Sequence, residues 1–254
     1  MLPLQGKKGI ILGIANDQSL AWGCAKAFHD QGAELALSYF NGKAKPHVAP
    51  LAEKVEAPIF LPLDVTDQEQ WDTFFAAIEQ QWGEIDFALH SVVFAPKEDL
   101  HGRVVDCSSQ GFLQAMDISC HSFIRMAKAC EPLMTRGGSI LAMSYYGAQR
   151  VIENYNMMGP VKSALEASVR QMADELGESH IRVNALSAGP IETRAASGLS
   201  GFDKLMEQAA AKAPLHQLTT IDDVGAVAAF LVSDAARHIT GQIQFVDCGY
   251  NIIG

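Results

Sequence analysis

A tyrosine and a lysine seven positions apart, Tyr155 and Lys162, are the side chains of this sequence with the clearest chemical use. Seven residues are about two helical turns, so the spacing predicts both side chains on one helix face, about 10 Å apart along the backbone. A nearby ammonium group favours the phenolate and is expected to lower the tyrosine pKa below about 10. Such a pair would suit a site where negative charge develops on a substrate oxygen. The competing interpretation is a surface tyrosine and a solvated lysine, because many helices carry both at this spacing.

A loop near the N-terminus indicates a nucleotide site. The first apolar segment ends at Gly13, and the next helical pattern begins near Ser19. In a doubly wound sheet, the first strand-to-helix turn is where a dinucleotide pyrophosphate meets helix amides. Gly13 would allow the tight turn and Ser19 would supply a hydroxyl, although the loop lacks the G-x-G-x-x-G pattern. A plain glycine turn followed by a serine N-cap explains the same residues.

Further candidate contacts follow later strand patterns. Asp64 and Val65 come directly after the third pattern, where the carboxylate would either accept from an adenine amino group or cap the next helix. Residues 91–93 end the fourth pattern, and residues 187–193 follow the sixth. Residues 39–43, after the second, hold neither the acid that binds a ribose 2′-hydroxyl nor an arginine for a 2′-phosphate. Because carboxyl ends of parallel strands meet at one edge, these positions predict one ligand crevice.

Apolar segments of strand length alternate with longer amphipathic segments along the chain. Strands are expected at 9–12, 34–39, 59–63, 85–90, 139–143, 182–186 and 243–246, and helices at 20–31, 45–55, 68–82, 111–131, 157–176, 202–211 and 222–232. Gly32 and Gly177 predict helix ends, and Thr66 with Glu69 predicts a capping box. The alternation predicts an α/β fold, in which residues 1–254 form a single doubly wound Rossmann-type domain with a seven-stranded parallel sheet flanked by helices.

Composition narrows the functional class. The 254 residues are 48% hydrophobic and 19% charged, which is typical of a soluble globular protein. The sequence contains no run of about 18 apolar residues, so no membrane span is expected. A net charge of −10 argues against general nucleic-acid binding. The five cysteines are scattered, with no C-x-x-C, and the eight histidines show no ligand spacing, so no metal site is expected. Scattered cysteines and the lack of a signal peptide indicate a reducing, cytoplasmic location.

The motifs together resemble those of the bacterial enoyl-acyl-carrier-protein reductases, a divergent branch of the short-chain dehydrogenase/reductase family. The resemblance rests on Gly13-x5-Ser19-x-Ala21, on the block Ser144-Tyr145 to Lys162, and on Arg182-Val183-Asn184 through Ile191. Most short-chain enzymes place three residues between the tyrosine and the lysine. Six intervening residues and a second, upstream tyrosine are typical of the enoyl reductases.

The resemblance implies reduction of trans-2-enoyl thioesters on acyl carrier protein, in fatty acid elongation, by hydride transfer from a nicotinamide cofactor. NADH is the expected form, with NADPH left open. Tyr155 would stabilise the enolate oxygen, Lys162 would hold the nicotinamide ribose, and Tyr145 would contact substrate or relay a proton. The implied cofactor contacts are Gly13, Ser19, Leu20, Phe40, Asp64, Val65, Val92, Lys162, Ile191, Glu192, Thr193, Arg194 and Ala195. Ala95 would contact the substrate with Tyr145 and Tyr155.

The resemblance also implies a homotetramer and a substrate-binding lid around residues 191–212. Arg194 and Lys204, near this lid, are candidates for docking the acidic carrier protein, with solvated charges as the alternative. Two other functions stay open: a short-chain carbonyl reductase or alcohol dehydrogenase, and a non-catalytic dinucleotide-sensing protein. The six-residue gap and Tyr145 argue against the first, and the presence of both Tyr155 and Lys162 argues against the second.

Overall fold

The computed structural model describes residues 2–193 and 201–253, and their strands form one seven-stranded sheet of order β3-β2-β1-β4-β5-β6-β7. Every neighbouring pair is parallel. The strands are β1 (Lys8–Leu12), β2 (Glu34–Tyr39), β3 (Ile59–Pro62), β4 (Phe87–His90), β5 (Gly138–Tyr145), β6 (Ile181–Ala188) and β7 (Ile243–Val246). All seven predicted strands are confirmed. β5 and β6 are longer than expected, because their pairing continues to Tyr145 and Ala188.

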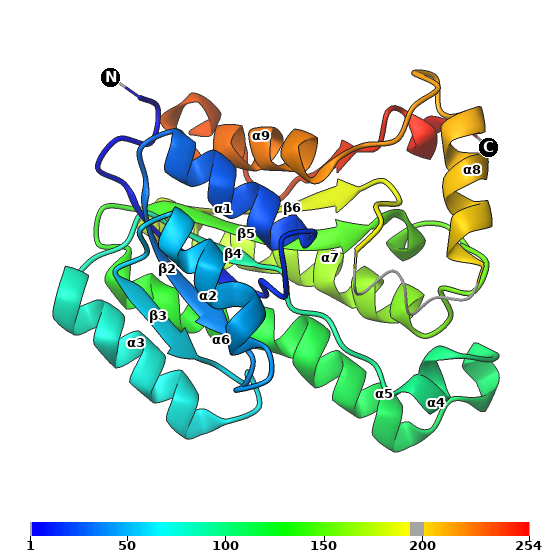
Figure 1. The fold of residues 1–254 in the computed structure, drawn as a ribbon, viewed down its shortest axis with the longest axis horizontal. Helices are drawn as coiled ribbons and strands as arrows, with labels where there is room; N and C mark the ends of the chain where they lie inside the picture. Colours follow the sequence, from blue (N-terminus) through cyan, green and yellow to red (C-terminus); the bar gives the residue numbers. More distant parts are fainter. Residues whose placement is uncertain (1, 194–200, 254) are drawn as a thin grey trace.

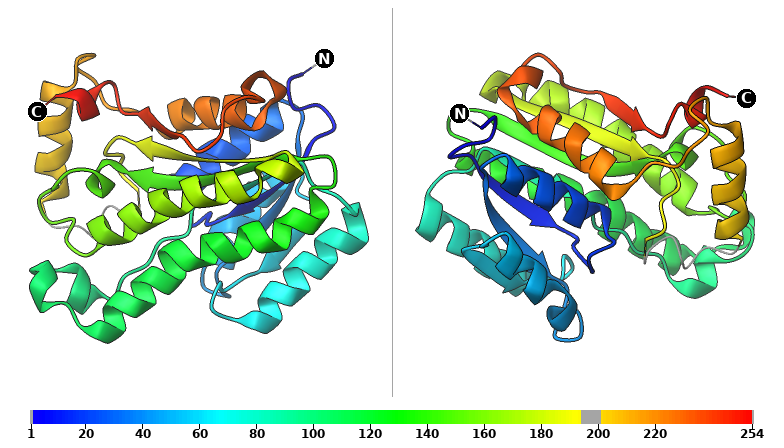
Figure 2. Two further views of the ribbon diagram at one scale, coloured as in Figure 1. Left: turned by 180° about the vertical axis from the view of Figure 1, so that it is seen from behind. Right: turned by 45° about the horizontal axis from the view of Figure 1, so that its top comes forward.

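Helices cover both faces of this sheet (Figure 1). One face carries α1 (Leu20–Asp30), α2 (Lys45–Lys54) and α9 (Ile221–Val232); the other carries α3 (Gln68–Trp82), α5 (Ser109–Met116), α6 (Ser122–Cys130) and α7 (Met158–Glu175). The short α4 (Lys97–Leu100) and α8 (Phe202–Lys212) lie at the end of the molecule beyond the sheet. In the right-hand view of Figure 2, α1 and α9 run side by side on one face.

The sheet separates two apolar cores. Ile10 and Leu12 belong to the cluster that includes residues of α3, α6 and α7, whereas Ile11 belongs to the cluster that includes residues of α1, α2 and α9. Successive strand residues point to opposite faces, so a strand covered by helices on both sides must be apolar throughout. This explains why the central strands are continuous apolar runs and why the predicted α/β class is correct.

The sheet order reverses between β1 and β4, which places a crevice at their carboxyl ends. Gly13 follows β1 with a φ of +104°, a backbone conformation open to glycine and rarely to other residues. A β-carbon there would overlap the carbonyl oxygen of Ser91, which follows β4. The tight turn predicted at Gly13 is therefore present, and it brings the first loop against the end of β4.

The helix predicted over 111–131 is interrupted. It consists of α5, a π-helical segment at Asp117–His121, and α6. The Ser119 hydroxyl in this segment donates to the carbonyl oxygen of Phe94 at 3.0 Å and accepts from the Phe94 amide at 2.9 Å. The π-helical turn thus anchors the loop after β4, and such turns are frequent at functional sites.

One of the three predicted helix boundaries is wrong. The capping box at Thr66 and Glu69 is absent because the Thr66 hydroxyl donates to Asp64 at 2.7 Å, while Asp67 is the N-cap of α3 and accepts from the Gln70 amide. Gly32 does follow α1 with a positive φ of 95°. Gly177 likewise follows the end of α7, whose last residue is Glu175 and whose C-cap is Leu176, and it begins a 3₁₀ turn, Gly177–Ser179.

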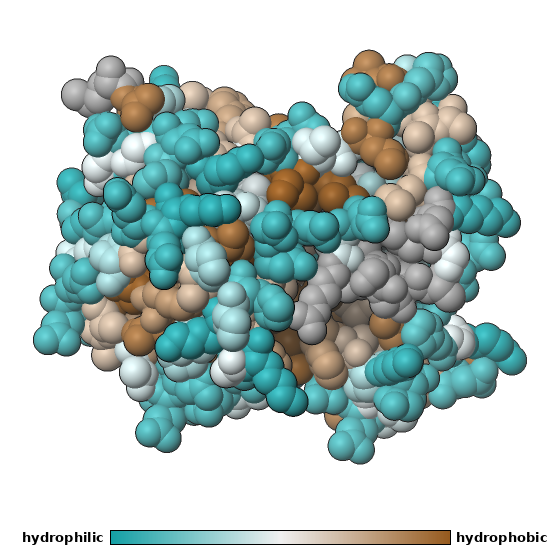
Figure 3. Space-filling model, in the orientation of Figure 1, coloured by the Kyte–Doolittle hydropathy of each residue, from teal (hydrophilic) through white to brown (hydrophobic). Residues whose placement is uncertain are grey.

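The face seen in Figure 3 is mostly hydrophilic, with separate apolar patches between polar side chains. Among the described residues, no helix is both long enough and apolar enough to cross a bilayer.

Replacing Gly13 by alanine should lower the free energy of unfolding by about 1–3 kcal/mol, because the new methyl group meets the Ser91 backbone at a φ unsuited to alanine. Gly42→Ala is the matched control. Nothing lies within 4 Å of a β-carbon at Gly42, so its effect should stay within about 0.5 kcal/mol. Urea unfolding measures both, and equal stability of the two variants would contradict the close approach of the first loop to β4.

Candidate active site

Tyr155 lies in the loop before α7 and not on the helix, because α7 begins at Met158. The prediction of one shared helix face with Lys162 is therefore wrong. Asn154 and Asn156 flank the tyrosine with φ values of 63° and 45°, a left-handed conformation that asparagine tolerates better than most residues. The Asn156 amide donates to the Leu100 carbonyl at 2.8 Å, which ties the loop to α4.

The loop brings Tyr155 against the second candidate tyrosine. Tyr145 is the last residue of β5, and the two ring centroids are 4.8 Å apart with the planes tilted by 58°. A β-carbon at Gly147 would overlap the Tyr155 ring, so the glycine permits this close approach. Tyr146 points elsewhere and donates to the Asn251 carbonyl at 3.0 Å. Of the two adjacent tyrosines, Tyr145 is therefore the one that faces Tyr155.

Lys162 is buried, with 6% of its surface exposed, and its ammonium group donates to the Met143 carbonyl at 2.6 Å. Met143 lies two residues before Tyr145 in β5, so the cation sits beneath the strand end that carries the tyrosine. Burial lowers the pKa of Lys162 to about 8, opposed by attraction to Cys120 and Glu166. At neutral pH the group therefore still carries its proton.

The pKa of Tyr155 is raised above its ordinary value, contrary to the sequence-based prediction. Burial is the main cause, and repulsion from Tyr145 and Glu166 adds to it. Burial likewise raises the pKa of Tyr145, with a contribution from Tyr250. The hydrogen bond of the Lys162 ammonium goes to the Met143 carbonyl and not to either phenol. Both tyrosines are thus neutral phenols at physiological pH, suited to donating a hydrogen bond.

Two buried hydroxyl groups at the ends of β5 and β6 have no partner among the described residues: the phenol of Tyr145 and Oγ of Ser187. An unpaired buried polar atom costs about 1–3 kcal/mol. Buried hydroxyls are normally bonded to protein, water or ligand. Their position at the carboxyl edge, where doubly wound sheets bind ligands, fits a site that accepts a polar molecule.

The predicted cofactor contacts follow β1, β2, β3, β4 and β6 and therefore lie toward the same edge of the sheet. Gly13 meets Ser91 and Val92 directly. Of the predicted contacts, the structure describes Gly13, Ser19, Leu20, Phe40, Asp64, Val65, Val92, Lys162, Ile191, Glu192 and Thr193, whereas Arg194 and Ala195 lie outside the described residues.

The predicted cofactor-contact residues differ in their hydrogen bonding and in their burial. Ser19 is the N-cap of α1, but its hydroxyl donates to the Asn16 carbonyl at 2.6 Å. The Asp64 carboxylate accepts from the Thr66 amide and hydroxyl, so it organises the loop after β3 and does not cap α3. Phe40 is 56% exposed after β2, and Val65 is buried in the core beside α3.

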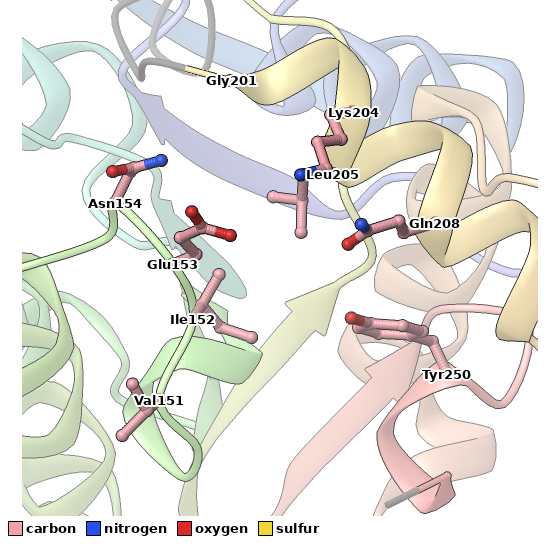
Figure 4. A pocket seen from close by; sticks show the side chains of 9 residues that line it. All are labelled: Val151, Ile152, Glu153, Asn154, Gly201, Lys204, Leu205, Gln208 and Tyr250. Carbon is pink, nitrogen blue, oxygen red and sulfur yellow. The ribbon is translucent and has the colours of Figure 1, made fainter.

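A cavity of about 190 Å³ separates the loop before Tyr155 from α8 (Figure 4). Figure 4 shows the side chains of Glu153, Gln208 and Tyr250 pointing toward one another across it. Lys204 also lines the cavity. The part of the expected lid at 194–200 lies outside the described residues. No three His, Cys, Asp or Glu side chains gather as a metal site in the described part of the chain.

Glu166 is a buried residue of this region that sequence reasoning missed. Its carboxylate accepts from the Ser144 hydroxyl at 2.6 Å and from the Gln149 amide at 3.0 Å. The sequence feature that could have identified Glu166 is its position one helical turn after Lys162, which places both residues on the same side of α7.

The strand order and the crevice at β1 and β4 define a dinucleotide-binding fold of the Rossmann type. The family model described as "Enoyl-(Acyl carrier protein) reductase" matches residues 13–251. The enoyl-[acyl-carrier-protein] reductase [NADH] FabI of Rickettsia typhi is 47% identical over 251 residues, which cover 99% of this chain and 96% of the relative. The chain belongs to the enoyl-(acyl carrier protein) reductase family.

Solved structures agree with this assignment. The enoyl-(acyl-carrier-protein) reductase of Anaplasma phagocytophilum, in complex with NAD, is 50% identical with a TM-score of 0.96 and covers 100% of this chain and 97% of that one. The Bacillus cereus enoyl-acyl carrier protein reductase, with NADP⁺ and indole naphthyridinone, is 43% identical with a TM-score of 0.97 and covers 100% of both chains. The resemblance to enoyl reductases is thereby confirmed for the fold and the family.

Removing the hydroxyl group from either of the adjacent residues Tyr145 and Tyr146 should change the free energy of unfolding, and the two changes should have opposite signs. Both are measured in the protein without added nucleotide. Tyr145→Phe should raise the free energy of unfolding by about 1 kcal/mol, because its buried hydroxyl has no partner. Tyr146→Phe should lower it by about 1 kcal/mol, because its hydroxyl donates to the Asn251 carbonyl. Urea unfolding measures both, and a Tyr145→Phe loss as large as that of Tyr146→Phe would show that the Tyr145 hydroxyl has a protein partner.

Proposed function

We propose that this chain is an NADH-dependent enoyl-acyl-carrier-protein reductase, which converts trans-2-enoyl thioesters to saturated acyl thioesters in fatty acid synthesis. The observation that carries the proposal is the contact of the Tyr145 and Tyr155 rings at the carboxyl edge of a dinucleotide-binding sheet, with the buried Lys162 bonded to Met143, two residues before Tyr145. Family membership and the NAD-bound relative support the same cofactor and reaction.

The residues of the site fit a nicotinamide cofactor, as the unpartnered Tyr145 and Ser187 hydroxyls indicate. When bound, the cofactor supplies the hydride for the substrate β-carbon. Gly13 and the N-terminus of α1 would hold the pyrophosphate, and Lys162 the nicotinamide ribose. The wider contact set proposed is Ser19, Leu20, Phe40, Asp64, Val65, Val92, Ile191, Glu192, Thr193, Arg194 and Ala195.

The catalytic task of the protein is to stabilise the enolate oxygen that forms as the β-carbon is reduced. Tyr155 would donate its phenol hydrogen to this oxygen, and a neutral phenol is the form that the raised pKa maintains. The Lys162 charge would add positive potential nearby. Tyr145 and Ala95 would contact the acyl thioester, with Tyr145 also able to relay the proton that completes reduction at the α-carbon.

The surroundings of the site suggest how the carrier-bound substrate is received. The lid is proposed around 191–212, a range that includes α8, and the cavity of Figure 4 lies between α8 and the loop before Tyr155. Arg194 and Lys204 are proposed as the basic contacts for the acidic carrier protein. A homotetramer is proposed from the family, and it would cover exposed apolar side chains such as Leu113, Ile124 and Phe230. Five free cysteines support a reducing compartment, the cytoplasm.

Tyr155→Phe should lower kcat for a crotonyl thioester by about 10²–10³-fold, the usual cost of removing one donor to a developing oxyanion. NADH oxidation followed at 340 nm gives the rate. Tyr146→Phe, whose hydroxyl is bonded elsewhere, should retain the wild-type rate. Undiminished turnover by Tyr155→Phe would remove the proposed role, and turnover of ketones alone would favour a carbonyl reductase.

The value of kcat/KM should fall as pH rises through about 8, because the buried Lys162 loses its proton there. Its pKa is lowered relative to an exposed lysine, so the loss of charge comes earlier in pH than for a surface residue. Lys162→Arg should lack this limb in whatever activity remains, because guanidinium keeps its charge. A limb that is unchanged in Lys162→Arg would assign the titration to another group.

A further inference from the structure

Glu166 lies in α7 with 4% of its surface exposed. A carboxylate is rarely buried to this degree unless it is paired or hydrogen-bonded, because leaving water costs several kcal/mol. Its two oxygens each accept one hydrogen bond, from the Ser144 hydroxyl and from the Gln149 amide. Neither of these donors carries a charge, so they satisfy the oxygens and leave the negative charge unbalanced.

The contacts of Glu166 and Lys162 converge on one short stretch of β5. Lys162 donates to the carbonyl of Met143, and Glu166 accepts from the side chain of Ser144, the next residue. Tyr145 follows immediately. Two residues one turn apart in α7 therefore hold the two residues that precede the tyrosine facing Tyr155.

Several other ionisable groups near Lys162 are neutral, which singles out the Glu166 carboxylate as the source of negative charge. Burial and the nearby Lys162 lower the pKa of His90, on β4, to about 3, so this histidine is neutral. Burial raises the pKa of the Cys120 thiol, in the π-helical segment, so it is also neutral at physiological pH. Tyr155 and Tyr145 are neutral phenols for the same reason. Cys120 and Glu166 are the two groups that oppose the lowering of the Lys162 pKa, and of these two only Glu166 is a carboxylate.

We propose that Glu166 is a positioning residue of the active site, which fixes Ser144 at the end of β5 and supplies the negative charge that balances the Lys162 ammonium. It acts through Lys162 and β5 and does not touch the reacting atoms. The use of Lys162 in reduction rests on the proposed function, whereas the placement of the two buried side chains, one helical turn apart in α7 and bonded to adjacent residues of β5, rests on the structure alone. Without Glu166, the buried lysine would lose its proton at lower pH, and the site would lose its positive charge near neutrality.

The test is to titrate Lys162 itself, by ¹³C NMR of lysine side chains, in the wild type and in Glu166→Gln. Lys162→Arg identifies the resonance. Glutamine keeps the shape and an oxygen that accepts from Ser144, but removes the charge. The Lys162 midpoint should fall by about one pH unit, at the lower end of the effect of an adjacent opposite charge. The alkaline limb of kcat/KM should move by the same amount in the same direction.

Glu175→Gln is the matched control, because it removes an exposed carboxylate from the same helix. Its Lys162 midpoint should equal that of the wild type. An unchanged midpoint in Glu166→Gln would overturn the proposal. So would a shift of equal size in Glu175→Gln, since that would reflect the net charge of the chain.

A second measurement needs no variant and covers the case in which Glu166→Gln does not fold. The ¹³C resonance of the Glu166 side-chain carbon in the wild type should be that of a carboxylate at pH 7, and a protonated carboxyl group would overturn the proposal. Neither NMR readout depends on turnover. A lowered Lys162 midpoint in a chain that reduces no enoyl thioester would therefore contradict the proposed function and leave the role of Glu166 supported.

Discussion

The burial of a lysine ammonium beneath the end of β5 is the constraint on which the site depends. A buried cation needs hydrogen-bond acceptors and an opposing charge, and here the Met143 carbonyl supplies the first. Because Met143 belongs to the strand that ends in Tyr145, the same hydrogen bond fixes the helix that carries the lysine against the strand that carries the phenol. A single contact between α7 and β5 therefore both satisfies a donor of the buried cation and positions the strand that carries the phenol.

The arrangement assigns different tasks to the phenols and the ammonium. Burial keeps Tyr145 and Tyr155 protonated, so each can donate a hydrogen bond, and it brings the pKa of Lys162 close to physiological pH without removing its charge. The loop at Asn154 and Asn156, together with the space left by Gly147, places Tyr155 against Tyr145. A site built in this way is prepared to receive negative charge on a substrate oxygen before the substrate binds.

Much of the fold could be predicted from the sequence because it depends on patterns that are local. Continuous apolar strands alternating with amphipathic helices predicted every strand of the sheet, and Gly13 predicted the turn at its switch point. The π-helical segment at Asp117–His121 was missed because its cause is tertiary: Ser119 bonds the loop at Phe94.

The site was predicted in its residues but not in its geometry. Helical spacing placed Tyr155 on α7, yet the residue lies in a loop between two asparagines of left-handed conformation, and the Asn156 side chain bonds this loop to the distant Leu100 carbonyl. The prediction of a lowered Tyr155 pKa considered the neighbouring charge and could not include burial, which dominates. Glu166 escaped notice because its partners Ser144 and Gln149 are distant along the chain from it.

The most direct test of the account is a crystal structure of the chain with NAD⁺ and a crotonyl thioester, a pair that cannot react to the saturated product. The account predicts the Tyr155 phenol oxygen within about 3 Å of the thioester carbonyl oxygen, and the Lys162 ammonium beside the nicotinamide ribose. A thioester bound with its carbonyl away from Tyr155, or a nicotinamide ring outside the crevice at the carboxyl ends of β1 and β4, would contradict it.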